Sequence, residues 1–136
     1  MFEHSKYQNL AFGWWHSAPA PQLMESKKVW FTIVRNPYDR ISSELKLAKK
    51  TAEDLMKMEI PEYGHFCRQV SLAKYADHIC RYETLPKDLN GFLEENGYPK
   101  IDLSDFRRRG HPLSDEQKSA IRDRYLDDFR EFGYPT

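Results

Sequence analysis

The sequence predicts an α/β fold in which a short parallel sheet is flanked by helices. An apolar run at residues 29–34 has the β-branched and aromatic composition of a strand, and a second short run at residues 77–81 is expected to form another strand. Segments with helix start and stop signals lie between these runs and after them. Because parallel strands need a crossover connection that usually contains a helix, this alternation favours a parallel sheet.

The first strand is expected at residues 29–34, VWFTIV. The run has almost no polar interruption, which is typical of a strand covered on both faces. We expect it to end at Arg35.

A helix should begin immediately afterwards and continue to about Lys50. Asn36 is a preferred N-cap residue, and Pro37 suits the first helical position because its missing N–H costs nothing there. Asp39 is expected to reach back toward the cap and to favour the positive end of the helix. Ile41, Leu45 and Ala48 would share one face.

Four further elements are expected before residue 97. Thr51 is expected to cap a helix that Pro61 ends, and a third helix is expected over residues 65–75. The second strand, residues 77–81, would lie parallel to the first. Pro86 then opens a helix that Asn96-Gly97 terminates with a left-handed cap.

The last helix has the clearest boundaries in the sequence. Ser114 and Gln117 form a capping box, and Gly133 follows the end of the helix. An apolar stripe should face the core, and it consists of Ile121, Tyr125, Phe129 and Phe132.

The composition suits one small domain over residues 1–136, with an aromatic N-terminal arm at residues 1–28 and a core at residues 29–136. The 136 residues are 40% hydrophobic and 14% aromatic, enough for a modest core. Lys+Arg and Asp+Glu balance at 21 each, so no global charge favours nucleic acid or a membrane surface.

Targeting and metal signals are lacking in the sequence. Residues 1–6 have no apolar signal-peptide core and no apolar stretch could span a bilayer, which predicts a cytoplasmic protein without a membrane segment. Cys67 and Cys80 are expected to be buried reduced thiols, and no metal-ligand spacing is present.

The corner after the first strand is a candidate anion site. Ligands bind at strand C-termini in α/β sheets, and N–H groups at a helix start attract phosphate. Arg35 lies beside that start and could clamp an anion, while Ser43 shares a helix face with Asp39. A plain strand–turn–helix corner, with Arg35 and Arg40 in surface ion pairs, explains the local pattern equally well.

A family resemblance favours the anion site. The segment FTIVRNPYDRISSEL resembles the 3′-phosphate-binding motif of sulfotransferases that use 3′-phosphoadenosine 5′-phosphosulfate (PAPS), especially the carbohydrate sulfotransferase branch with its pattern F-x-V-R-N-P-Y-D-R-L-V-S. Residues 79–85, ICRYETL, are similar to the family's strand ending R-Y-E-x-L. Residues 113–134 are similar to its closing helix, L-S-x-E followed by Y-x-x-D-F-x-x-F-G-Y.

The resemblance implies a P-loop-NTPase-like fold and a nucleotide site. In the family, the motif's arginine and the serine eight positions later hold the 3′-phosphate, and these positions correspond to Arg35 and Ser43. Arg81, Tyr82 and Glu83 match a second family segment, where either ligand contact or a buried ion pair bracing the sheet would account for them.

One family segment has no counterpart. Family members begin with a strand and a loop of the type P-K-x-G-T-T/S that holds the 5′-phosphosulfate, and no glycine here follows a lysine in such a turn. The chain therefore resembles a sulfotransferase without its first βα unit. It could be a fragment, it could receive the donor loop from elsewhere, or it could have lost sulfuryl transfer.

Two further site predictions depend on looser similarity. His16 stands before the first strand roughly where heparan-sulfate-modifying relatives place a catalytic base, and a hydrogen-bonded histidine on an aromatic arm is the alternative. Arg107, Arg108 and Arg109 occupy a place similar to the basic segment that closes over the nucleotide in cytosolic sulfotransferases. They could equally be a solvated surface loop.

The expected function is transfer of a sulfuryl group from PAPS to a hydroxyl acceptor, with a carbohydrate as the expected acceptor, and without a metal. The alternative is a non-catalytic module that binds 3′-phosphoadenosine 5′-phosphate (PAP) or another anion, or an incomplete sulfotransferase. A P-loop kinase fits less well because G-x-x-x-x-G-K-S/T is absent. A homo-oligomer or the N-terminal arm is expected to cover the open sheet edge.

Overall fold

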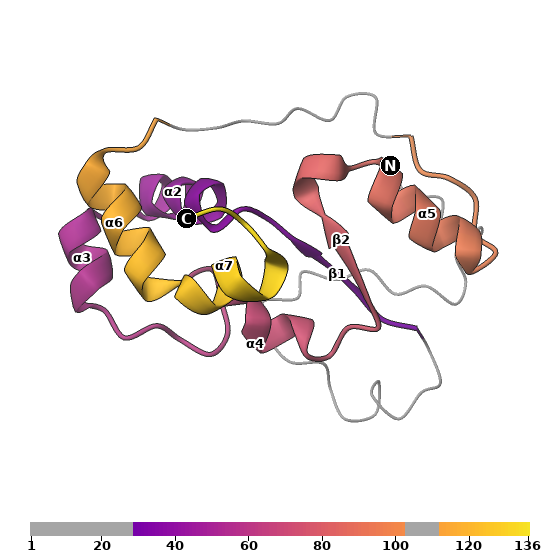
Figure 1. The fold of residues 1–136 in the computed structure, drawn as a ribbon, viewed down its shortest axis with the longest axis horizontal. Coiled ribbons are helices and arrows are strands. Elements are labelled where there is room, and N and C mark those ends of the chain that lie inside the picture. The colour runs from indigo at the N-terminus through magenta and orange to yellow at the C-terminus, as the bar shows by residue number, and fades with distance from the viewer. Residues whose placement is uncertain (1–28, 103–111) are drawn as a thin grey trace.

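The computed structural model describes residues 29–102 and 112–136, and within them the fold is α/β (Figure 1). Strands β1 (Phe31–Val34) and β2 (His78–Arg81) pair in parallel. Their register places Phe31 opposite His78 and Val34 opposite Arg81. The α/β class and the parallel pairing predicted from the sequence are confirmed.

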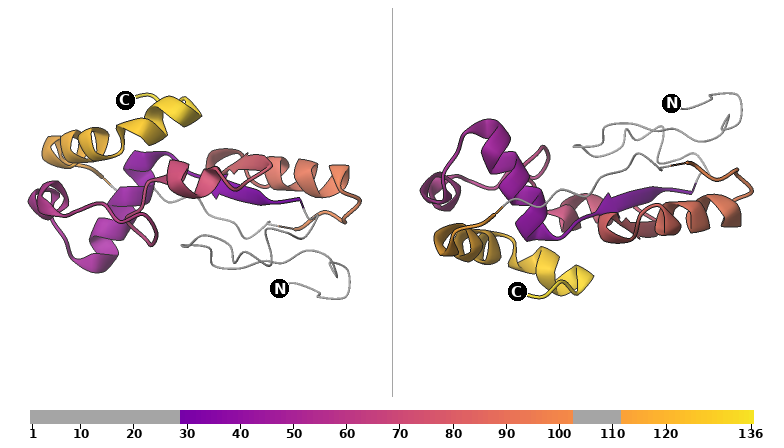
Figure 2. Two further views of the ribbon diagram at one scale, coloured as in Figure 1. Left: turned by 90° about the horizontal axis from the view of Figure 1, so that it is seen from below. Right: turned by 90° about the horizontal axis from the view of Figure 1, so that it is seen from above.

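Each face of this small sheet has an exposed isoleucine. Val34 is 1% exposed, whereas Ile33 on the same strand is 42% exposed and Ile79 on β2 is 38% exposed. Helices α4 (Gln69–Ala73) and α5 (Lys87–Glu95) lie on the same side of the sheet (Figure 2). The expectation that the first strand is covered on both faces is therefore wrong at Ile33, which pairs with Cys80 on the face that α5 packs against.

Four helices gather at one end of the sheet and share a core (Figure 1). They are α2 (Pro37–Ala48), α3 (Ala52–Lys57), α6 (Asp115–Arg124) and α7 (Leu126–Phe132). Their apolar faces bury a continuous cluster that includes three residues of the predicted stripe, while the fourth, Phe132, is buried outside it. The members of the cluster are Ile41, Leu45, Leu55, Ala120, Ile121, Tyr125 and Phe129.

A second core lies between β2 and α5. Cys80 from the strand packs with Leu89, Phe92 and Leu93 from the helix. The ring of Phe31 on β1 contacts that of Phe92, with centroids 4.8 Å apart. Gly97 follows α5 at φ +78°, as the left-handed cap predicted.

The helix expected over residues 65–75 is limited to Gln69–Ala73. Side chains from elsewhere bind the carbonyls that a longer helix would use. Arg40 donates to the carbonyls of His65 and Cys67, and the Tyr125 hydroxyl donates to that of Phe66. Because these acceptors are already satisfied, the segment before Gln69 stays in turns that are tied to α2 and to the end of α6.

The last predicted helix is in fact two. Tyr125 leaves the helical region, at φ −122° and ψ 25°, and separates α6 from α7. Arg68 Nε donates to the Arg124 carbonyl at the break, which satisfies an acceptor that the helix gives up. The capping box of Ser114 and Gln117 and the left-handed Gly133 are both confirmed.

The helix capped by Thr51 ends at Lys57 and not at Pro61. Arg124 donates to the Met58 carbonyl just beyond α3 and so ties that end to α6.

In the described ranges, no helix has both the length and the apolar character needed to cross a bilayer. The arm at residues 1–28, with His16, and the cluster of Arg107, Arg108 and Arg109 lie outside the described residues.

Candidate anion site at the β1–α2 corner

Arg35 lies at the carboxyl end of β1, where the strand turns into α2. Its guanidinium carbon stands 4.3 Å from the centre of the Tyr82 ring, and Tyr82 directly follows β2. The residues after both strands therefore meet at one sheet edge, as parallel strands require. A guanidinium has the planar, forked shape that binds a planar or tetrahedral anion, and here it lies over an aromatic ring at the end of a strand.

The backbone of Arg35 is fixed from the other side by Gln69. The Arg35 N–H donates to Gln69 Oε1 across 2.7 Å, and Gln69 Nε2 donates to the Arg35 carbonyl across 2.7 Å. Gln69 is the first residue of α4 and is buried. One side chain thus satisfies both backbone groups of Arg35 at the point where β1 ends.

The start of α2 is capped by its own N-cap residue and by a carboxylate that is distant in the sequence. Asn36 accepts the Tyr38 N–H as predicted for an N-cap, and Pro37 occupies the first helical turn. The Asn36 N–H donates to the Glu83 carboxylate across 3.0 Å. The expectation that Asp39 reaches back to this cap is wrong, because Glu83 takes the amide that it would need.

These caps change how the corner could bind an anion. Two of the amides at the helix start have protein acceptors, and Pro37 has no amide to give. The Asp39 carboxylate adds negative charge to the same turn. Anion binding here would therefore depend on the Arg35 side chain and neighbouring hydroxyls more than on the helix amides.

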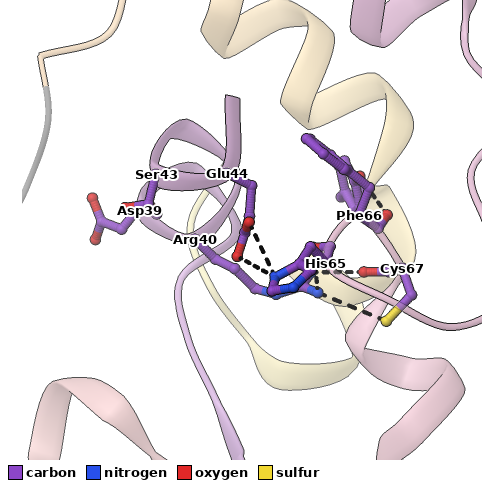
Figure 3. Close-up of polar contacts among 8 residues, drawn as sticks. Asp39, Arg40, Ser43, Glu44, His65, Phe66 and Cys67 are labelled. Carbon is purple, nitrogen blue, oxygen red and sulfur yellow. Dashed lines mark hydrogen bonds and ion pairs between the residues drawn. The ribbon is translucent and has the colours of Figure 1, made fainter. Parts of the chain in front are cut away.

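Ser43 lies one turn beyond Asp39 on α2. Its hydroxyl donates to the Asp39 carbonyl across 3.0 Å, and its side chain is half-buried. Figure 3 shows Asp39 and Ser43 pointing away from Arg40 and Glu44, which turn toward the loop at His65–Cys67. The hydroxyl can rotate from the carbonyl to a ligand at small cost, because a backbone carbonyl in a helix already accepts its helical bond.

Arg40, the second arginine of the motif, has a structural role: its guanidinium donates to backbone carbonyls of the loop before α4. Its two terminal nitrogens donate to the Cys67 carbonyl at 2.6 Å and the His65 carbonyl at 3.0 Å (Figure 3). The predicted alternative of a surface ion pair therefore does not describe Arg40. This arginine braces the loop that leads into α4.

The segment Arg81–Glu83 contacts the C-terminal tail. The Arg81 guanidinium lies over the Tyr134 ring at 5.2 Å, and the Tyr134 hydroxyl donates to the Glu83 carboxylate. Burial and the Glu83 carboxylate raise the pKa of Tyr134 well above its usual value. The carboxylate that caps α2 is thus held by the tail hydroxyl and the Asn36 amide, in place of the buried ion pair considered from the sequence.

The thiols and metal-ligating groups offer no second site. Cys67 and Cys80 are buried and free, as predicted, and burial raises the pKa of Cys80 to about 11. Within residues 29–102 and 112–136, no group of three or more His, Cys, Asp or Glu side chains could hold a metal ion.

Sequence reasoning missed Gln69 entirely and the cap from Glu83. Gln69 has no local signal, because its partners lie 34 residues away at Arg35 and 59 residues away at Asp128. Glu83 stands in a recognised segment, yet only the parallel pairing of β1 and β2 brings it to Asn36. Comparison with models of known families, with curated proteins and with solved structures found no match for the chain.

Proposed function

We propose that this chain is a PAPS-dependent sulfotransferase-like protein whose β1–α2 corner binds the 3′-phosphate of the nucleotide. The observation that carries the proposal is Arg35, which stands at a strand C-terminus with both backbone groups bound and its guanidinium on the Tyr82 ring. A cation held in this way at a strand end is suited to a phosphate.

Ser43 is the second proposed phosphate ligand. It follows Arg35 by eight positions, the spacing of the sulfotransferase motif, and its half-buried hydroxyl lies on the helix that starts beside Arg35. The Glu83 carboxylate at the start of this helix accepts the Asn36 amide and the Tyr134 hydroxyl, which reduces its repulsion of an incoming anion.

In the proposed reaction an acceptor hydroxyl, on a carbohydrate, attacks the sulfur of PAPS. The bond between sulfur and the bridging phosphate oxygen breaks, PAP leaves, and the hydroxyl proton passes to a base. His16 is the proposed base and Arg107, Arg108 and Arg109 are proposed to contact the nucleotide, all on the family resemblance. PAPS supplies the sulfuryl group, and no metal is proposed.

The second candidate is a non-catalytic module that binds PAP or another anion, or an incomplete sulfotransferase. The sequence favours it in one respect: no P-K-x-G-T segment is present to hold the 5′-phosphosulfate. The fold proposal is correspondingly a P-loop-like sheet that lacks its first βα unit.

A transfer assay separates the two candidates. The chain is incubated with PAPS carrying sulfur-35 and with polysaccharide or oligosaccharide acceptors, and label on the acceptor is counted. Transfer that Arg35→Ala abolishes supports the enzyme. No transfer, together with PAP binding, supports the module, and absence of both transfer and PAP binding contradicts the proposal.

We also propose that a second copy of the chain covers the open edge of the sheet. Within the described ranges β1 pairs with β2 alone, and Ile33 on β1 and Ile79 on β2 expose apolar surface on opposite faces of the pair. Size-exclusion chromatography with light scattering tests this, and a monomer at high micromolar concentration would contradict it.

A further inference from the structure

Three hydrogen-bonded residues connect the C-terminal helix to the candidate anion site. Asp128 on α7 is fully buried, and its two carboxylate oxygens accept the N–H groups of Gln69 at 2.8 Å and Val70 at 2.9 Å. Gln69 in turn makes the two 2.7 Å hydrogen bonds to the Arg35 backbone. We call Asp128, Gln69 and the Arg35 backbone the positioning relay.

Each step of the positioning relay fixes an orientation. The two bonds to Asp128 hold the first turn of α4 in place, and α4 carries Gln69 as its first residue. To make both bonds, the side-chain amide of Gln69 must turn its oxygen toward the Arg35 N–H and its nitrogen toward the Arg35 carbonyl, which fixes its orientation. The backbone of Arg35, and with it the Cα–Cβ direction, is fixed where the strand ends.

The guanidinium end of Arg35 has its own support. Tyr82 lies under it at 4.3 Å, so the side chain is guided at its base by Gln69 and at its tip by an aromatic ring. An arginine restricted before binding loses less conformational freedom when a phosphate binds, and it presents its donors in one direction.

We propose that Gln69 and Asp128 are positioning residues for Arg35 and set the preference of the site for a 3′-phosphorylated nucleotide. The inference rests on the proposed function, because it assumes that Arg35 contacts the 3′-phosphate. Neither Gln69 nor Asp128 touches the ligand. They act through the Arg35 backbone alone.

The test compares PAP with adenosine 5′-phosphate, which lacks the 3′-phosphate, by calorimetry. In the Gln69→Met variant, which keeps the volume but loses both amide bonds, PAP affinity should fall about tenfold while adenosine 5′-phosphate affinity stays unchanged. In the Arg35→Ala background, the same Gln69→Met change should cost no further affinity, since Arg35 is the group that it acts through.

The chain offers a matched control. Asn90 makes the same pair of bonds to Ile101, donating to its carbonyl at 3.1 Å and accepting its N–H at 2.7 Å, but it lies on α5. Asn90→Leu should leave the ratio of PAP to adenosine 5′-phosphate affinity at the wild-type value. If the Gln69→Met variant does not fold, the Gln69→Glu variant takes its place in the same comparison. Glu keeps the acceptor for the Arg35 amide but loses the donor to the Arg35 carbonyl.

The outcomes are distinguishable. Wild-type preference for PAP that persists in a folded Gln69 variant overturns the positioning role and leaves the proposed function intact. An equal loss of affinity for PAP and for adenosine 5′-phosphate also overturns the positioning role, since a general loosening of the site would weaken both nucleotides alike. Absence of PAP binding by the wild type overturns the proposed function and the inference together.

Discussion

The Asn36 amide donates to the Glu83 carboxylate across 3.0 Å, and this one bond joins the start of α2 to the end of β2. Glu83 also accepts the Tyr134 hydroxyl, so three segments distant in sequence meet at one carboxylate. A negative charge at the start of a helix is favourable in itself, because the helix dipole is positive there. The Glu83 carboxylate thus stabilises the fold at the corner where we propose the anion site.

Loss of this carboxylate should destabilise the chain. Glu83→Ala leaves the Asn36 amide and the Tyr134 hydroxyl without their acceptor and should lower the free energy of unfolding by about 2 kcal/mol. Urea unfolding followed by circular dichroism measures this. The control is Glu94→Ala, an exposed carboxylate on α5 that should change stability by about 0.5 kcal/mol or less. Equal effects of the two changes would contradict the role of Glu83.

Two neighbouring serines separate ligand binding from helix structure. Ser42 and Ser43 both donate to the Asp39 carbonyl at 3.0 Å, but Ser42 is buried and Ser43 is half-buried on the Asp39 face. Ser43→Ala should weaken PAP binding about tenfold through loss of a hydroxyl–phosphate bond, and Ser42→Ala should leave it unchanged. Calorimetry on both variants decides, and equal affinities would remove Ser43 from the site.

Arg40 should matter for stability and not for the nucleotide. Arg40→Lys keeps the charge but cannot donate to the His65 and Cys67 carbonyls in the same forked geometry, so unfolding should become easier by about 1–2 kcal/mol. PAP affinity should stay at the wild-type value. Arg130→Lys, at an exposed position of α7, is the control for stability. A selective loss of PAP binding in Arg40→Lys would assign this arginine to the ligand instead.

The thiols should be unreactive until the chain unfolds. Burial raises the pKa of Cys80 to about 11, so roughly one Cys80 thiol in a thousand is ionised at pH 8. In the native chain, the rate at which Cys80 reacts should rise about tenfold for each unit of increase in pH, up to that pKa. A thiol-reactive chromophore measures this, with urea-unfolded chain as the reference. A native thiol that reacts as fast as in urea would contradict the burial of Cys67 and Cys80.

Local signals predicted the helix starts well. The caps at Asn36, Thr51 and Ser114 depend on residues within three positions, so the sequence alone contained the interaction. Gly97 and Gly133 marked helix ends for the same reason.

Errors arose where distant side chains take over backbone groups. The segment before Gln69 does not become helical because Arg40 and Tyr125 bind its carbonyls, and no pattern within residues 65–75 contains that information. The same holds for Glu83, which displaces Asp39 at the cap of α2. In the candidate site, Arg35 could be predicted from its place after a strand, whereas Gln69 required the three-dimensional arrangement.

The central claim is that Arg35 forms a working 3′-phosphate site, and titration calorimetry of PAP tests it most directly. Wild-type chain should bind PAP with micromolar affinity, and Arg35→Ala should lose about two orders of magnitude, since a charge-assisted pair with phosphate is removed. Arg122→Ala, an arginine on the outer surface of α6 paired with Asp123 at 3.8 Å, should bind like the wild type. PAP binding that is absent from the wild type, or unchanged in Arg35→Ala, would contradict the claim.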